Sequence, residues 1–211
     1  EDLANHSWKG RILISPASNI YNQSLLAAMV AANGAELSEK WARGLVGNLA
    51  HVPSGNDTDQ IKEVAGNIAD AAIVESHYIA LLQSSRKPED IAAAQKISIF
   101  FPNQSYATQS IARPDGNNSF ISGTHIDVSG GAVSKSATNR DNAIKLLEFL
   151  SSDEAQFIMT EKNYEFPVVK NVPLAKSLAV WEEFEIDNKH IQDSHLRRKD
   201  AMRIADTVGW K

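Results

Sequence analysis

The residues of this chain that could do chemistry are oxygen and nitrogen donors, because its 211 residues include no cysteine. Six histidines and four tyrosines accompany 26 aspartates and glutamates. His77 and Tyr78 are adjacent, Glu75 lies two positions before His77, and Tyr21 opens a different segment. Taken alone, either tyrosine could be a packed aromatic residue with its hydroxyl hydrogen-bonded, and a lone histidine is more often structural than a ligand. The surrounding sequence must decide between these interpretations.

Several catalytic chemistries are missing from the sequence. Without cysteine there are no disulfides, thiolate metal sites or cysteine nucleophiles. The chain also has no Gly-x-Ser-x-Gly elbow, no phosphate-binding glycine-rich loop with lysine and no His-Glu-x-x-His pattern. Its carboxylates show no spacing that singles out an acid–base pair. We therefore expect a protein that is not an enzyme.

Composition is that of an ordinary globular protein, with 43% hydrophobic and 22% charged residues. A net charge of −5 gives no reason to expect a nucleic acid partner, and the short basic run 197–199 is interpreted as a solvated helix face. No apolar run is long enough to cross a bilayer, and no signal peptide is visible. The chain begins with Glu-Asp-Leu rather than Met, so we expect any export signal to lie upstream.

Alternating strands and helices are expected to position the candidate residues. Apolar runs at residues 11–15, 70–74 and 97–101 predict buried strands. The first is followed by two helices that meet at Asn33–Gly34, the second of which buries Trp41 and Leu45. Further helices are predicted near these residues: 58–64, from 75, 143–150, 153–159, 174–184 and 199–208. This order implies parallel strands joined by right-handed crossovers, and hence an α/β fold.

Several segments together resemble the ferric-ion-binding proteins of ABC importers, in the type II periplasmic-binding-protein class. Ser-Asn-Ile-Tyr-Asn-Gln-Ser at 18–24 and Gly-Asn-Asp-Thr-Asp at 55–59 are two of the matching strings. The others lie at residues 1–3, 8–12, 100–104, 123–130, 145–156, 163–168 and 208–211. Each string is weak alone, but together they follow one order along nearly the whole chain. Only the segment 105–122 departs, because it is longer than the family's usual connection.

The resemblance implies an α/β protein of two lobes that close on a ligand about a hinge. By this pattern, residues 1–99 and 173–211 form the second lobe, and residues 100–172 are the returning part of the first lobe. The hinge is expected near 100–103, and 105–122 is expected to be an exposed excursion. Family members carry roughly a hundred more residues upstream, so the first lobe is expected to be incomplete in this chain.

The resemblance also implies a binding site for Fe³⁺, a hard cation that prefers oxygen donors. A free phenol is protonated at neutral pH, with a pKa near ~10, but a trivalent ion favours the phenolate. Proteins of this family hold iron with tyrosines, two of them adjacent at a strand-to-helix junction. Tyr21 occupies one tyrosine position in its motif, and Tyr78 occupies the second position of the adjacent pair.

The sequence departs from the family pattern at two positions. His77 stands where the first tyrosine of the pair is expected, and it replaces an anionic donor with a neutral, softer one. We expect His77 to be a ligand and the preference for Fe³⁺ over Fe²⁺ or Zn²⁺ to fall. Glu75 stands where the family often has asparagine, and it could add a ligand or repel an accompanying anion. Ser18 and Asn56 could donate to such a synergistic anion at helix N-termini, although ordinary capping explains both as well.

The function implied is capture of ferric iron in the periplasm or another extracytoplasmic compartment, for delivery to an ABC importer permease, by a protein that is monomeric at full length. Two alternatives stay open at this point. One is a protein of the same fold that binds a small anion or an organic solute. The other is a degenerate paralogue that binds no metal.

Overall fold

The structure is a computed structural model that describes residues 2–104, 123–181, 183–188 and 190–211. The predicted excursion 105–122 lies outside the described residues. The chain begins with two 3-10 helices, η1 (Asp2–Ala4) and η2 (His6–Trp8), whose apolar side chains Leu3, Ala4 and Trp8 pack on the main core.

Two parallel strands form the sheet among the described residues. β1 (Ile12–Ile14) and β2 (Ala71–Ile73) pair in the register Ile12 to Ala71 and Ile14 to Ile73. Both strands were predicted. β1 is buried along its whole length, because isoleucine and leucine fit a pleated surface covered on both faces. The connection between them runs through helices, as a parallel pair requires.

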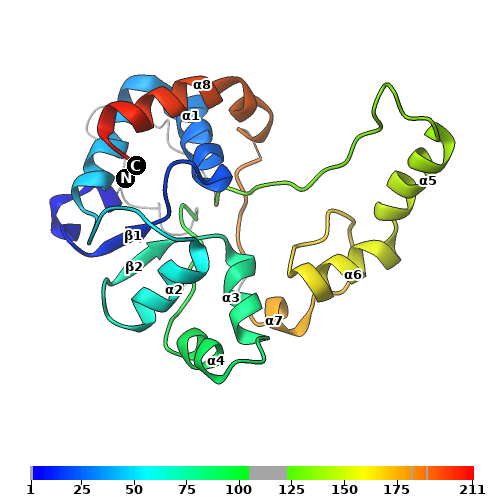
Figure 1. Cartoon of the computed structure of the whole chain (residues 1–211), viewed down its shortest axis with the longest axis horizontal. Helices are drawn as coiled ribbons and strands as arrows, with labels where there is room; N and C mark the ends of the chain where they lie inside the picture. The colour runs from blue at the N-terminus through cyan, green and yellow to red at the C-terminus, as the bar shows by residue number, and fades with distance from the viewer. Residues whose placement is uncertain (1, 105–122, 182, 189) are drawn as a thin grey trace.

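Helix α1 (Ile20–Gly47) covers the sheet and has a kink at Gly34, where φ is 78° and ψ is 167°. The predicted boundary between two helices at this glycine is therefore confirmed as a sharp change of direction. Helix α8 (Ile191–Val208) packs along α1 (Figure 1). The main core lies between them, with Leu26, Trp41 and Leu45 against Ile204 and Trp210. Helix α8 begins eight residues before the predicted position.

Three short helices form a smaller core on the other side of β2 (Figure 1). They are α2 (Asp57–Ala65), α3 (Ser76–Gln83) and α4 (Pro88–Gln95). Helix α4, which begins at Pro88, was not predicted from the sequence. Its Ala94 packs with Ile61 of α2 and with Ile79 of α3.

Two predicted elements are wrong or much shorter in the structure. Residues 97–101 are not a strand, and Phe100 is 73% exposed. A short apolar run is ambiguous, and here the described part of the chain supplies no strand that pairs with it. The helix predicted at 174–184 is reduced to α7 (Lys176–Ala179), which contacts α3.

Helix α5 (Arg140–Leu150) and the start of α6 (Asp153–Asn163) stand apart from the rest of the described chain (Figure 1), whereas Thr160 near the end of α6 accepts from the Ala175 N–H at 3.1 Å. Both helices were predicted, α6 with its Ser152 cap. No residue of α5 is buried, and Leu146, Phe149 and Phe157 are exposed. These two amphipathic helices therefore leave apolar faces uncovered.

Three segments of the chain meet where this pair of helices joins the body. Thr124 forms a bridge with Ile186, and the buried Gln104 amide accepts from the Glu185 N–H at 2.6 Å and donates to Thr124 Oγ1 at 3.1 Å. Gly123 adopts φ +92°, and a Cβ there would lie 2.5 Å from the Ile186 carbonyl carbon. Only glycine allows this close approach.

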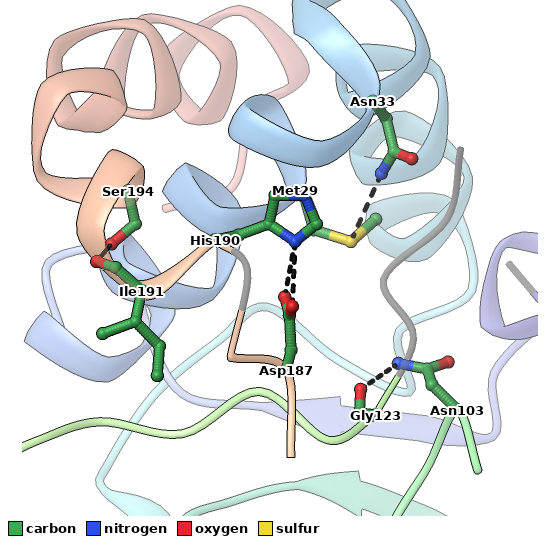
Figure 2. A network of polar contacts seen from close by, with 8 residues as sticks. All are labelled: Met29, Asn33, Asn103, Gly123, Asp187, His190, Ile191 and Ser194. Atoms are coloured by element: carbon green, nitrogen blue, oxygen red, sulfur yellow. Dashed lines mark hydrogen bonds and ion pairs between the residues drawn. The ribbon is translucent and has the colours of Figure 1, made fainter. Parts of the chain in front are cut away.

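A hydrogen-bonded pair of side chains lies beside this crossing (Figure 2). His190 Nδ1 lies 2.8 Å from Asp187 Oδ2, and Asp187 is almost fully buried. Asn103 Nδ2 donates to the Gly123 carbonyl at 3.5 Å close by. His190 therefore contacts a buried carboxylate beside the crossing.

No helix among the described residues is long and apolar enough to cross a membrane.

Candidate metal site

Tyr21 lies in the first turn of α1, just beyond the carboxyl end of β1. Asn19 caps this helix, and its side-chain oxygen accepts from the Tyr21 backbone N–H at 3.0 Å. Asn22 Nδ2 donates to the Ser15 carbonyl at 2.7 Å, which holds the same turn against the end of the strand. The Ser-Asn-Ile-Tyr-Asn motif is therefore a strand-to-helix junction in which the polar residues shape the backbone and the tyrosine projects from it.

His77 and Tyr78 lie in the first turn of α3, which follows β2 directly. Because β1 and β2 are parallel neighbours, the helices that follow them begin at the same edge of the sheet. The Tyr21 ring centroid is 6.0 Å from that of His77 and 6.4 Å from that of Tyr78, and the last two rings are 4.1 Å apart. The structure thus brings Tyr21 together with His77 and Tyr78, which follow it by more than fifty residues in the sequence.

The phenol of Tyr21 is protonated in this state. Burial, followed by interactions with Tyr78 that include a hydrogen bond, raises the pKa of Tyr21 to about 12, and Glu75 and Asp127 add to the effect. Burial lowers the pKa of His77, against the opposing influence of Glu165 and Asp57, so its imidazole is neutral at neutral pH. A neutral imidazole has a lone pair available for a metal.

Glu75 is the N-cap residue of α3 and faces two other carboxyl groups. Burial raises the pKa of Glu75 to about 8, and the charges of Asp127 and Asp57 and a hydrogen bond with Asp127 add to the shift. The carboxyl group therefore carries a proton at neutral pH. Together with the phenol of Tyr21, it gives the site protons that a bound cation could displace.

Two residues of this cluster were missed by sequence reasoning. Asp127 approaches Glu75 and Tyr21 from the segment after the crossing, and Asp57 approaches from the start of α2. No local motif marks Asp127. Asp57 stands inside the matching string 55–59, which was the one available signal.

His125 borders the same region. Its Nε2 lies 3.1 Å from Ser24 Oγ of α1 and 3.8 Å from Asp127 Oδ2. Burial lowers its pKa. His125 therefore packs between α1 and the crossing segment.

Among the described residues, the hydrogen bonds of Ser18 and Asn56 lead to neighbours in their own segments and not to the ring cluster. Asn56 caps α2 in a capping box with Asp59, at 3.2 Å from the Asp59 N–H. Ser18 is exposed, and its carbonyl accepts from Gln23 Nε2 at 3.2 Å. The capping interpretation accounts for Asn56, and anion binding by either residue stays a prediction.

Within the described residues, no three histidine, aspartate or glutamate side chains are arranged to hold a metal ion. Any metal site in this cluster therefore depends on the phenol oxygens of Tyr21 and Tyr78. That donor set favours a hard, highly charged cation, because the phenol must lose its proton on binding.

In α/β folds ligands bind at the carboxyl ends of parallel strands, and the ring cluster of Tyr21, His77 and Tyr78 lies at such an edge. The sequence pattern of the family described as "Bacterial extracellular solute-binding protein" matches residues 1–186, so the chain belongs to this family.

Curated relatives of the chain are named as iron uptake proteins. It is 40% identical over 211 residues to iron uptake protein A2 and 41% identical over 211 residues to iron uptake protein A1, both of Synechocystis sp.. Each match covers 100% of this chain, but only 57% of A2 and 54% of A1. The chain thus spans little more than half the length of these relatives.

Solved structures confirm the fold. A Trichodesmium protein (IdiA, FutA) in complex with iron and citrate matches with a TM-score of 0.88 and 45% identity, over 100% of this chain and 62% of that chain. The ferric binding protein from Campylobacter jejuni matches with a TM-score of 0.88 and 36% identity, over 100% of this chain and 62% of that one. The predicted type II periplasmic-binding-protein fold is therefore correct, although the chain corresponds to only part of those structures.

Proposed function

We propose that this chain is the ligand-bearing part of an extracytoplasmic substrate-binding protein that captures ferric iron and delivers it to an ABC importer permease. The observation that carries the proposal is the convergence of Tyr21, His77 and Tyr78 at two neighbouring helix starts. The names of the iron uptake relatives and of the solved ferric binding protein support the same cargo.

The chemistry of the site fits this cargo as a substrate. Fe³⁺ would displace the protons of Tyr21 and Tyr78 and accept the neutral nitrogen of His77. Glu75 could ionise beside the bound cation, which would reverse the effect of Asp127 and Asp57 on its proton. The residues bind and release a cation and carry out no bond-making reaction, which fits a protein that is not an enzyme.

Binding of an anion together with the metal is the second candidate. It is favoured by one observation, since the Trichodesmium structure carries citrate as well as iron. A carboxylate ligand of that kind would supply the hard oxygen donors that His77 does not. Protonated Glu75 could also donate a hydrogen bond to it.

The domain organisation is part of the proposal. Residues 1–99 and 173–211 would form one lobe, and residues 100–172 would contribute to another that is completed by sequence found in the longer relatives. The exposed apolar side chains of α5 and α6 support this division, because an amphipathic helix needs a partner for its apolar face. The crossing at Gln104, Thr124 and Ile186 would then be the hinge.

The proposal is tested by metal binding to a form of the protein as long as its iron uptake relatives. Tyrosinate-to-Fe³⁺ charge transfer should colour the purified protein orange to red. Tyr78→Phe keeps the ring and removes the donor, so Fe³⁺ affinity should fall at least about tenfold, or ~1.4 kcal/mol, with the unfolding temperature nearly unchanged.

Tyr164→Phe is the matched control, because Tyr164 is also half-buried but lies at the end of α6 and packs with Ala175 and Leu178. It should leave the colour and the affinity unchanged. A protein that stays colourless with Fe³⁺ but binds citrate would favour the alternative of a same-fold protein for a small anion or an organic solute. One that binds neither would favour a degenerate paralogue.

A further inference from the structure

Asp57 is a buried carboxylate that connects the two helix starts of the candidate site. It is the first residue of α2 and only 2% exposed. Its Oδ1 accepts from Ser15 Oγ and from Asn19 Nδ2, both at 3.1 Å. Its Oδ2 accepts from the Glu75 backbone N–H at 2.8 Å.

One oxygen of Asp57 therefore holds the start of α1. Ser15 follows β1, and Asn19 is the residue whose side-chain oxygen caps the Tyr21 backbone N–H. The Ser15 hydroxyl also accepts from Asn19 Nδ2 at 2.8 Å. The backbone position of Tyr21 is thus linked to Asp57 through two hydrogen-bonded side chains.

The other oxygen holds the start of α3. Glu75 is the N-cap residue of this helix, and its carbonyl accepts from the Tyr78 N–H at 3.2 Å. The bond from the Glu75 N–H to Asp57 therefore fixes the turn that presents His77 and Tyr78. The Glu75 side chain does not cap α3. The hydrogen bond to Asp57 therefore restrains the backbone at the N-cap of this helix.

The side chain of Asp57 is not needed to cap its own helix. Asn56 and Asp59 already form the capping box of α2. A buried carboxylate is costly unless each oxygen is hydrogen-bonded, and here every bond leads to a segment that carries a candidate ligand. The hydrogen bonds of Asp57 therefore serve the starts of α1 and α3, which carry the candidate ligands, rather than the capping of α2.

We propose that Asp57 is a positioning residue for the metal site, which holds Tyr21 and the His77–Tyr78 pair at the spacing that binding requires. This inference rests on the proposed function. Asp57 would act on the site through its hydrogen bonds with Asn19 and Glu75 rather than as a ligand of the metal.

Asp57→Asn tests the proposal in a form of the protein as long as its relatives. Asparagine has one carbonyl oxygen and one amide NH₂ group, so it can keep one side of the bridge but not both. Fe³⁺ affinity should fall about tenfold, and the charge-transfer band should shift because the two phenolates no longer meet the metal as before.

Asp90→Asn is the matched control. Asp90 is similarly buried, in α4, and accepts from Ser85 Oγ at 2.7 Å and lies 2.6 Å from Lys62 Nζ. It has no bond to either helix start. A general loss of stability would weaken both variants alike, whereas a positioning role predicts a changed absorption maximum in Asp57→Asn alone.

A metal-free measurement separates this inference from the proposed function. Amide hydrogen exchange followed by NMR should be faster at Glu75 in Asp57→Asn, with α8 unchanged. If the unaltered protein binds no Fe³⁺, the iron proposal fails while the exchange result still tests the bridge. Unchanged exchange at Glu75, or unchanged affinity and colour in a protein that binds Fe³⁺, would overturn the positioning role.

Asn19→Ser serves if Asp57→Asn does not fold. Serine still caps a helix but cannot bridge to Asp57 as the longer amide does. We expect a smaller loss of Fe³⁺ affinity, about two- to fivefold, and a shifted absorption band. Affinity and absorption equal to those of the unaltered protein would contradict the proposal.

Discussion

His77 is the residue that should most affect the choice of metal. Its imidazole is neutral because burial lowers its pKa, and it lies against the ring of Tyr78 at 4.1 Å between centroids. Replacing it by tyrosine would add a second phenol at this helix start and hence a further anionic donor for Fe³⁺.

His77→Tyr is therefore expected to raise Fe³⁺ affinity about tenfold and to strengthen the visible absorption band. Titration with Fe³⁺ and with Zn²⁺ measures the change in preference. His51→Tyr is the control, because His51 pairs with Glu63 at 2.7 Å and lies outside the ring cluster. An unchanged spectrum in His77→Tyr would mean that residue 77 is not a ligand.

Glu75 should make the metal-free protein less stable as the pH rises. Its folded-state pKa, about 8, lies above the ordinary value of 4.5, because of burial and then of Asp127 and Asp57. Below pH 4.5 the carboxyl is protonated in both the folded and unfolded states. Between pH 4.5 and 8 only the unfolded state ionises, so the group progressively favours unfolding.

Glu75→Gln should therefore be more stable than the unaltered protein at pH 8, and the advantage should vanish near pH 4. Urea unfolding across this range, without metal, measures it. Glu39→Gln is the control, since Glu39 forms an exposed pair with Arg43. If the free energy of unfolding depends on pH in the same way for Glu75→Gln and the unaltered protein, burial and the neighbouring carboxylates do not raise the pKa of Glu75.

At the level of residues, the sequence pointed to candidate residues that lie just after a predicted strand. Tyr21, His77 and Tyr78 each follow a strand and were named from the family resemblance; the structure brings their rings together, and their role as ligands stays a prediction. Asp127 could not be found, because its contact with Glu75 depends on the path of the chain through the crossing. The bridging role of Asp57 depends on three segments meeting in space.

Among the elements, α1 depends on one glycine for its direction. Gly34 has φ 78° and ψ 167°, a region that is almost closed to residues with a Cβ. The change of direction at this point lets Trp41 and Leu45 reach the same core as Leu26.

Gly34→Ala should lower the free energy of unfolding by ~1–3 kcal/mol through backbone strain alone, since no atom lies within 4 Å of the added Cβ. Gly47→Ala is the control, in the same helix and with equally open space. It should be neutral or slightly stabilising, because alanine favours a helix. Equal urea midpoints for the two variants would contradict the strain.

Sequence patterns predicted helices better than strands in this chain. Helices α1, α2, α5 and α6 have caps or periodic apolar residues that act within a few positions. A strand needs a partner that local sequence does not reveal, and residues 97–101 failed as a prediction for this reason. The shortening of the 174–184 helix to α7 also depends on its packing against α3.

For the whole molecule, the contrast between the main core and the α5–α6 pair has a measurable result. Helices α1 and α8 bury their apolar faces on each other, whereas α5 buries none of its residues. Amides of α5 and α6 in the 211-residue chain should therefore exchange with solvent much faster than those of α8.

In a form as long as the iron uptake relatives, exchange in α5 and α6 should slow, with α8 as the internal reference. Hydrogen exchange with mass spectrometry compares the two forms directly. If α5 exchanges equally fast in both, the additional sequence does not cover it, and the proposed division into lobes is wrong.

Asn103 and Gly123, which flank residues 105–122 in the sequence, are joined by a hydrogen bond from the Gly123 N–H to the Asn103 carbonyl, at 2.8 Å. The geometry of the crossing should therefore depend little on how many residues separate Asn103 from Gly123, because the entropic cost of closing a connection grows slowly with its length. Peptide tags or small reporter domains could be inserted between Asn103 and Gly123, giving an attachment point that leaves Gln104, Thr124 and the ring cluster of Tyr21, His77 and Tyr78 in place.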